Sequence, residues 1–156
     1  MENVMSVAAY VYNRYQETYG QRIDEMKLHK MMYFAQKESL IQTDHALFDA
    51  TFYGWKYGPV LKDLRSAYRD DSFMHSVSEE VVMRIKPIID KVFEDYAAKS
   101  SWSLSRLTHG EISWKNSRQG VPQNVNSDNP INLDDIRLDA TRTKDRREML
   151  THYGLL

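Results

Sequence analysis

The sequence contains no cysteine. This absence excludes disulfide bonds, thiolate metal sites and cysteine nucleophiles, and it is compatible with a reducing cytoplasm. Long apolar runs are also missing: the longest, around Ala8–Tyr12 and Met31–Ala35, are far too short to span a bilayer. The N-terminal residues do not combine a basic segment with a following apolar stretch, as a secretion signal would. We therefore expect a soluble, cytoplasmic protein with no membrane partner.

The chain carries almost no net charge. Lys and Arg number 21 against 22 Asp and Glu, which gives a formal charge of −1. No global electrostatic field therefore points to nucleic acid or to an acidic membrane. With 156 residues, 42% of them hydrophobic, the chain can bury roughly 70% of its unfolded surface. We expect a single domain over residues 1–156.

Apolar side chains repeat at helical intervals in the first third of the chain. This spacing predicts an amphipathic helix over about residues 4–19, ended by Gly20. Asp24 can cap a second helix that runs to about Gln42. Because the second helix is apolar on more than one side, we expect it at the centre of the core of a compact, mainly α-helical domain.

A short aromatic stretch follows. Five aromatic residues lie between Phe48 and Tyr57, and their alternation with small or polar residues predicts a strand near residues 51–57. Proline suits the first turn of a helix, so Pro59 is expected to begin one. A segment at residues 73–77 is a possible partner strand for this small β element.

The second half of the chain is expected to be helical apart from one loop. Ser76 and Glu79 match a capping box, and Pro87 is expected to break the helix that follows, before a further helix to about Lys99. Residues 100–120 predict two short helices, each closed by a glycine. Turn-forming residues predict a mobile loop at 121–132, followed by a helix that starts at Asn132 and runs through about Leu138, in a charged C-terminal helical segment at 133–156.

The sequence shows no strong catalytic or metal-binding motif. The five histidines lack paired metal spacing, so neither a metal nor another cofactor is expected. His109 and Glu111 suit an acid–base pair of a hydrolase, but a histidine beside a turn glycine more often hydrogen-bonds the backbone. We expect the chain not to be an enzyme.

A basic cluster near the C-terminus raises a second possibility. Phosphate binding needs several cations without neighbouring acids, and here Asp139, Asp145 and Glu148 are interleaved with the basic residues. The segment therefore suits either a nucleic-acid-binding regulator or a surface helix with local ion pairs. The candidate nucleic-acid contacts are Arg142, Lys144, Arg146 and Arg147.

Three ordered stretches resemble the Panacea domain family, which includes phage-associated GepA-like proteins and SocA-like antitoxins. KLHKMMYFAQ (Lys27–Gln36) is similar to a helix of that family, and LFDATFYGWKYGPVLKDL (Leu47–Leu64) resembles its W-x-Y-G-P-V segment. LSRLTHGEISWKNSR (Leu104–Arg118) resembles its L-T-H-x-E-x-P-W-x-x-A-R stretch. The chain departs from the family pattern at Gly54, where alanine is common, at Ser113, where proline is expected, and at Asn116 and Ser117, which replace small residues.

The resemblance implies an antitoxin that neutralises a co-encoded toxin by direct protein–protein binding. It also implies that some members deliver their toxin to a Clp-type protease. Because Trp, Tyr and Arg are frequent energetic anchors of interfaces, the resemblance directs attention to its signature residues. The candidate partner-binding or signature positions are Lys30, Tyr33, Trp55, Tyr57, Gly58, Pro59, His109, Trp114 and Arg118.

Overall fold

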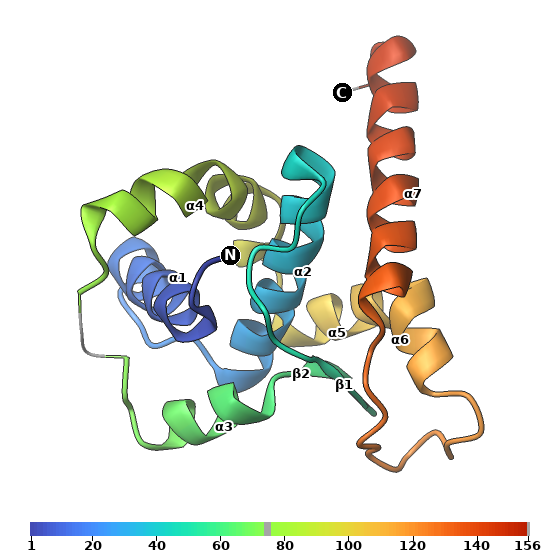
Figure 1. Cartoon of the computed structure of the whole chain (residues 1–156), viewed down its shortest axis with the longest axis horizontal. Helices are drawn as coiled ribbons and strands as arrows, with labels where there is room; N and C mark the ends of the chain where they lie inside the picture. Colours follow the sequence, from blue (N-terminus) through green and yellow to red (C-terminus); the bar gives the residue numbers. More distant parts are fainter. Residues whose placement is uncertain (74–75, 156) are drawn as a thin grey trace.

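One central helix organises the molecule. The computed structural model describes residues 1–73 and 76–155, and Figure 1 shows α2 between α1 and α4 on one side and α7 on the other. Most residues of α2 are buried, and it contacts α1, α3, α4, α5, α7 and β2. The fold is mainly α-helical with a small β element, and the expected central position of the second helix is confirmed. In chain order the described elements are α1 (Val4–Tyr19), α2 (Glu25–Thr43), β1 (Tyr53–Trp55), β2 (Gly58–Val60), α3 (Lys62–Arg69), α4 (Glu79–Val92), the π-helical turn η1 (Phe93–Ala97), α5 (Ser101–His109), α6 (Ile112–Ser117) and α7 (Leu133–His152).

Side-chain caps define the first two helices. The Asn3 side chain accepts hydrogen bonds from two backbone N–H groups of α1, and Gly20 ends that helix with a left-handed φ of 69°. Asp24 caps α2 by accepting from the Lys27 amide. Asp44, with a φ of 65°, follows the last residue of α2. Both predicted helices are therefore present, with boundaries within a residue or two of those expected.

The β element is a hairpin, and its predicted partner strand was wrong. β1 pairs with β2 in antiparallel register, Trp55 opposite Gly58, so the chain reverses within Lys56 and Tyr57. Gly58 makes this reversal possible because its φ of 118° is costly for other residues. Pro59 therefore lies in a strand and not at the start of a helix, a position that an edge strand tolerates. Of the predicted partner segment, residues 74 and 75 lie outside the described residues, and its other residues are not in a strand.

The start and course of α4 also differ from expectation. Ser78, and not Ser76, is the N-cap, accepting from the Val81 amide. The helix continues through Pro87 to Val92 and is not broken there. Pro87 is exposed, so water can satisfy the carbonyl that its missing N–H leaves unpaired. The buried apolar residues of α4 lie both before and after the proline, and their packing favours one continuous helix; they are Ile85, Ile88, Ile89 and Val92.

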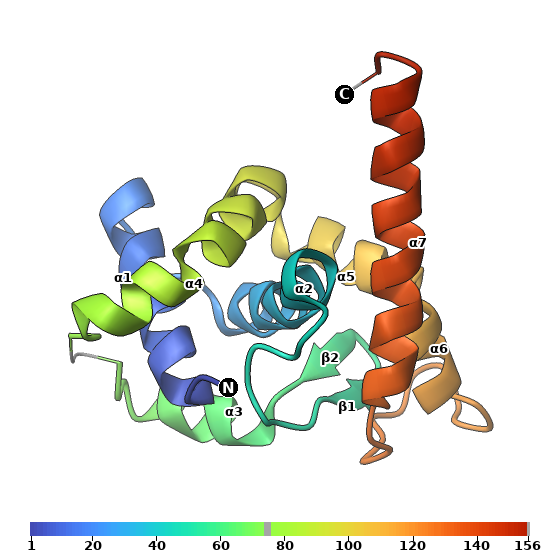
Figure 2. The same ribbon diagram turned by 45° about the horizontal axis from the view of Figure 1, so that its top comes forward.

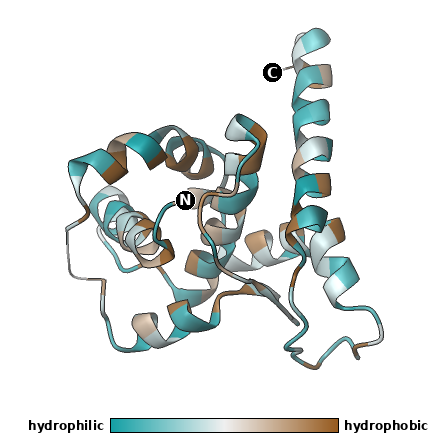
Figure 3. Ribbon diagram, in the orientation of Figure 1, coloured by the Kyte–Doolittle hydropathy of each residue, from teal (hydrophilic) through white to brown (hydrophobic). Residues whose placement is uncertain are grey.

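The C-terminal region forms two short helices and one long helix. α5 and α6 confirm the two short helices expected at 100–120. Asn132 caps α7, which continues well past Leu138 because no glycine or proline interrupts it before Gly154. Figures 1 and 2 show the C-terminal end of α7 standing clear of the rest of the molecule. Along this exposed length the helix is predominantly hydrophilic (Figure 3).

The segment at 121–132 returns along the hairpin before α7 begins. Gly54 donates its amide to the Asn129 carbonyl at 3.0 Å, and Ile131 donates to Phe52 at 2.7 Å. The Lys56 amide donates to the Asn126 side chain at 3.0 Å. These bonds attach the segment to β1 at several points; its predicted mobility stays a prediction.

Candidate partner-binding site

The family-like residues of α2 and the hairpin meet at a buried corner. Lys30 is only 2% exposed, and its Nζ donates to the Pro59 carbonyl at 3.4 Å. Gly58 lies directly over it: a Cβ at this position would lie 2.7 Å from Lys30 Cε and 2.6 Å from Thr108 Oγ1. Gly58 is thus required by close packing as well as by its φ. Lys30, Gly58 and Pro59 hold the hairpin against α2 and α5 and do not offer an exposed contact surface.

Burial lowers the pKa of the Lys30 ammonium to about 7. The unfolded side chain titrates near pH 10.4, so above pH 7 the unfolded state binds more protons and the free energy of unfolding should rise with pH. We expect a rise of roughly 2 kcal/mol from pH 7 to pH 9. Lys30→Met should remove this rise in urea denaturation at the two pH values. An equal rise in the free energy of unfolding in the wild-type protein and in Lys30→Met would refute the lowered pKa of Lys30 as its cause.

Tyr33 belongs to a buried polar network that joins α2, α6 and α7. Its hydroxyl lies 2.7 Å from Ser113 Oγ and donates to Asp139 Oδ2 at 3.3 Å. Asp139, buried on α7, also accepts from the amides of Ile112 at 2.8 Å and Ser113 at 2.9 Å. Burial raises the pKa of Tyr33 well above its ordinary value, which keeps the hydroxyl protonated. Asp139 therefore caps the start of α6 from another helix.

Arg118 and Trp114 tie the end of α6 to the hairpin and to the loop beyond it. The buried Arg118 guanidinium donates to the carbonyls of Gly54 at 3.0 Å and Val125 at 2.6 Å, and to two further carbonyls at residues 122 and 123. Trp114 Nε1 donates to the Trp55 carbonyl at 2.9 Å. The polar groups of both signature side chains therefore form hydrogen bonds with backbone carbonyls of the chain itself.

An exposed aromatic pair lies beside this corner. Tyr57, at the tip of the hairpin, is 44% exposed, and Trp102 of α5 is 57% exposed. Their rings meet edge to face with centroids 5.2 Å apart. Trp55 is less accessible: Arg65 lies over its ring at 5.1 Å, and its buried Nε1 has no acceptor among the described residues. Trp102 was not among the predicted site residues, although its position on a short amphipathic helix opposite Leu104 was a usable signal.

His109 and Glu111 do not form an acid–base pair. The His109 ring stacks on Trp114 at 4.1 Å and lines a cavity beside the hairpin. Glu111 instead accepts from Lys37 Nζ at 2.5 Å and lines a different groove, next to α7. Burial lowers the pKa of His109 and raises the pKa of Glu111. This arrangement counts against the hydrolase alternative, and the expectation that the chain is not an enzyme stays a prediction.

The basic cluster of α7 divides into paired and unpaired cations. Arg147 is partly buried and forms ion pairs with Glu38 of α2 at 2.9 Å and with Asp95 at 3.3 Å. These ion pairs fasten α7 to the core. Within residues 1–73 and 76–155, the other three basic candidates have no carboxylate within 4.0 Å, so the expected local ion pairs along the helix are not seen. These three are Arg142, Lys144 and Arg146.

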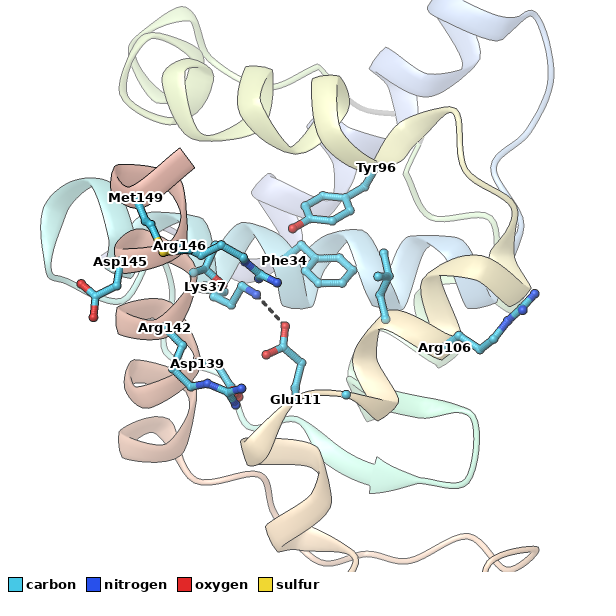
Figure 4. Close-up of a pocket in the computed structure, with 13 residues that line it drawn as sticks. Phe34, Lys37, Tyr96, Arg106, Glu111, Asp139, Arg142, Asp145, Arg146 and Met149 are labelled. Atoms are coloured by element: carbon cyan, nitrogen blue, oxygen red, sulfur yellow. Dashed lines mark hydrogen bonds and ion pairs between the residues drawn. The ribbon is translucent and has the colours of Figure 1, made fainter. Parts of the chain in front are cut away.

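A groove of about 640 Å³ runs between α7 and the body of the molecule (Figure 4). Its floor is the stacked pair Phe34 and Tyr96, with ring centroids 3.9 Å apart. Burial raises the pKa of Tyr96 to about 12. We call this feature the α7 groove; its lining includes Phe34, Tyr96, Leu107, Arg142, Arg146 and Met149, together with the acids Glu111, Asp139 and Asp145.

Comparison with known proteins assigns the family. A family model described as "Antitoxin SocA-like, Panacea domain" matches residues 28–115. The chain belongs to the Panacea domain family. The matched region of this Panacea domain runs from α2 into α6 and leaves α7 outside. Membership supports an antitoxin role in general terms. No curated protein and no solved structure matches the chain significantly.

The described residues lack the features of two other classes of protein. None of the described helices combines the length and apolar character needed to cross a bilayer. In the part of the chain that the structure describes, no three His, Asp or Glu side chains are grouped so that they could hold a metal ion.

The departures of this Panacea domain from the family pattern have structural counterparts. A methyl group at Gly54 would lie 2.1 Å from Ser117 Oγ and 2.9 Å from Ser117 Cβ. The Ser117 hydroxyl therefore occupies the room that an alanine at position 54 would need. At the second departure, Ser113 uses both its N–H and its hydroxyl in the network with Tyr33 and Asp139, and a proline has neither group.

We expect Gly54→Ala to lower the free energy of unfolding by about 1–3 kcal/mol, the usual cost of overfilling a packed site. Adding Ser117→Ala should recover part of this loss, because the contact with Oγ disappears while that with Cβ remains. Urea denaturation of the two single variants and the double variant measures the coupling. Strictly additive effects would contradict this direct contact.

Proposed function

We propose that this Panacea domain neutralises a co-encoded toxin by direct protein–protein binding in the cytoplasm and has no enzymatic activity of its own. The family match over residues 28–115 is the observation that carries the proposal. Support also comes from the exposed aromatic pair Tyr57 and Trp102, since tyrosine and tryptophan are frequent anchors of interfaces.

Expression of the adjacent gene in the host tests the proposal. The adjacent product alone should arrest growth, and co-expression of the Panacea domain should restore it. A Lys30→Glu variant, which places an unpaired carboxylate in the buried corner, serves as an unfolded control and should not restore growth. A neighbour that is harmless alone would remove the basis of the proposal.

Occlusion and delivery to a Clp-type protease predict different fates for the toxin. If the domain acts as an adaptor, the half-life of the toxin should shorten when the domain is present and should recover in cells that lack the protease. If binding alone silences the toxin, its half-life should stay the same or lengthen. Pulse-chase labelling of the toxin separates the two routes.

Nucleic-acid regulation is a second candidate, supported by Arg142, Lys144 and Arg146 on α7, which form no ion pair with any residue that the structure describes. Such binding would weaken steeply as salt rises, because phosphate contacts release counterions. A gel-shift titration with the DNA upstream of the gene, at low and moderate salt, tests this candidate. Absence of a shift at low salt would exclude it.

A further inference from the structure

The α7 groove combines an apolar floor with apolar residues on both walls. Leu107 of α5 is 44% exposed and Met149 of α7 is 53% exposed. Between these walls lie Phe34 and Tyr96, which belong to α2 and η1. The groove is therefore built by segments far apart in the sequence, with Phe34 almost fully buried at its base and Leu107 and Met149 exposed on its walls.

The acids of the groove already have partners or point elsewhere. Glu111 accepts from Lys37. Asp139 accepts from two amides at the start of α6 and from the Tyr33 hydroxyl. Asp145 also lines the groove, but it forms no ion pair with a described residue, and Figure 4 shows its carboxylate directed away from Arg146. Among the described residues, none of these acids forms an ion pair with Arg142 or Arg146.

Two arginines supply the unbalanced charge. Arg142 and Arg146 are one helical turn apart on α7, both exposed, and Figure 4 shows the Arg146 side chain directed into the groove. Neither has a carboxylate within 4.0 Å among the described residues. An acidic segment with apolar side chains on one face would match both the charge and the floor.

Nucleic acid fits the groove less well. Bases bind protein surfaces by stacking on free aromatic faces, whereas here Phe34 and Tyr96 stack on each other with an interplanar angle of 9°.

We propose that the α7 groove binds an acidic, amphipathic segment of the toxin. The apolar side chains of that segment would contact Leu107 and Met149, and its carboxylates would pair with Arg142 and Arg146. This inference rests on the proposed function, and it places the two contact arginines on a helix outside the region that the family model matches.

A matched pair of charge reversals tests the groove. Arg146 faces the groove, whereas Lys144 lines a separate cavity with Leu40–Asp44 on the other side of α7. In calorimetric titration with the purified product of the adjacent gene, Arg146→Glu should weaken binding by about tenfold or more, as expected for loss and reversal of an interfacial charge. Lys144→Glu should change the affinity by less than about twofold, since it lies outside the contact.

The outcomes separate this inference from the proposed function. If the wild-type chain binds the product and both variants bind equally well, the groove assignment is wrong while direct neutralisation stands. If both variants weaken binding equally, a general charge effect replaces the specific groove. If the wild-type chain forms no complex, the proposed function fails and the groove assignment fails with it.

Photo-crosslinking identifies the chemistry of the bound segment. A photoreactive residue placed at Met149 should capture one toxin segment that is rich in Asp and Glu and carries apolar residues at helical spacing. The same residue at position 144 should capture little of it. A captured segment without an acidic surplus, or capture of nucleic acid in place of the toxin, would overturn the proposal.

Discussion

Replacing Arg118 with methionine should lower the free energy of unfolding by about 3 kcal/mol. The guanidinium serves four backbone carbonyls from the hairpin and the following loop. Removing it leaves these acceptors without their charged donor, and a buried acceptor without a donor costs about 1–3 kcal/mol. Methionine keeps much of the side-chain volume, so the decrease in the free energy of unfolding should come from the lost hydrogen bonds and not from a cavity.

Arg118→Lys is the matched control. Lysine keeps the charge, but its single ammonium cannot reach carbonyls that lie in different directions, so it should recover only part of the stability. Urea denaturation gives the free energies, and hydrogen exchange should show faster exchange at the Gly54 amide, which is bonded to Asn129 in the same loop. Unchanged stability in Arg118→Met would refute the structural role.

Replacing Asp139 with alanine should cost about 3 kcal/mol or more. The carboxylate is almost fully buried and accepts from the Ile112 and Ser113 amides as well as from Tyr33. Its loss leaves two first-turn donors of α6 without their cap, and α6 has no other side-chain cap. We expect α7 to detach from α6 before the core unfolds, because this carboxylate links the two helices.

Asp139→Asn provides the comparison. The amide retains one oxygen acceptor and adds a donor, so this variant should lose clearly less stability than the alanine variant. Thermal unfolding followed by far-ultraviolet circular dichroism measures both, and proteolysis of α7 near Arg142 should increase in the alanine variant first. Equal stability of Asp139→Ala and wild type would contradict the capping role.

Periodicity and capping residues predicted much of the helical fold. Asp24 and Asn132 cap helices as expected, and the apolar residues around the middle of the second helix are buried at the centre of the core. These features depend on residues within a turn or two of one another, so a local pattern contains the necessary information. The same holds for the two short helices over residues 100–120.

The failures involve tertiary context. Pro87 is tolerated because its side of α4 is exposed. This exposure depends on tertiary packing and cannot be read from the local sequence pattern. The hairpin was missed because Pro59 was expected to begin a helix, whereas the positive φ of Gly58 allows immediate reversal of the chain. The α7 groove could not be predicted at all, since it brings together α2, η1, α5 and α7 from separate parts of the sequence.

The signature residues and the proposed contact surface have different locations. Lys30, Tyr33 and Arg118 are buried and bind groups of the chain itself. Among the signature residues, Tyr57 is the one at the tip of the hairpin and is well exposed. In the proposed arrangement the family-matched region positions α7 and supplies the floor and one wall of the α7 groove, while Arg142 and Arg146, which form no ion pair with any described residue, are available to a partner.

The most direct test of the account is to mix the purified Panacea domain with the purified product of the adjacent gene, without protease or nucleic acid. Size-exclusion chromatography and calorimetric titration should show a stable complex at micromolar concentration or below, with a defined stoichiometry. Neutralisation in cells without any such complex in solution would contradict the claim that direct binding is the function.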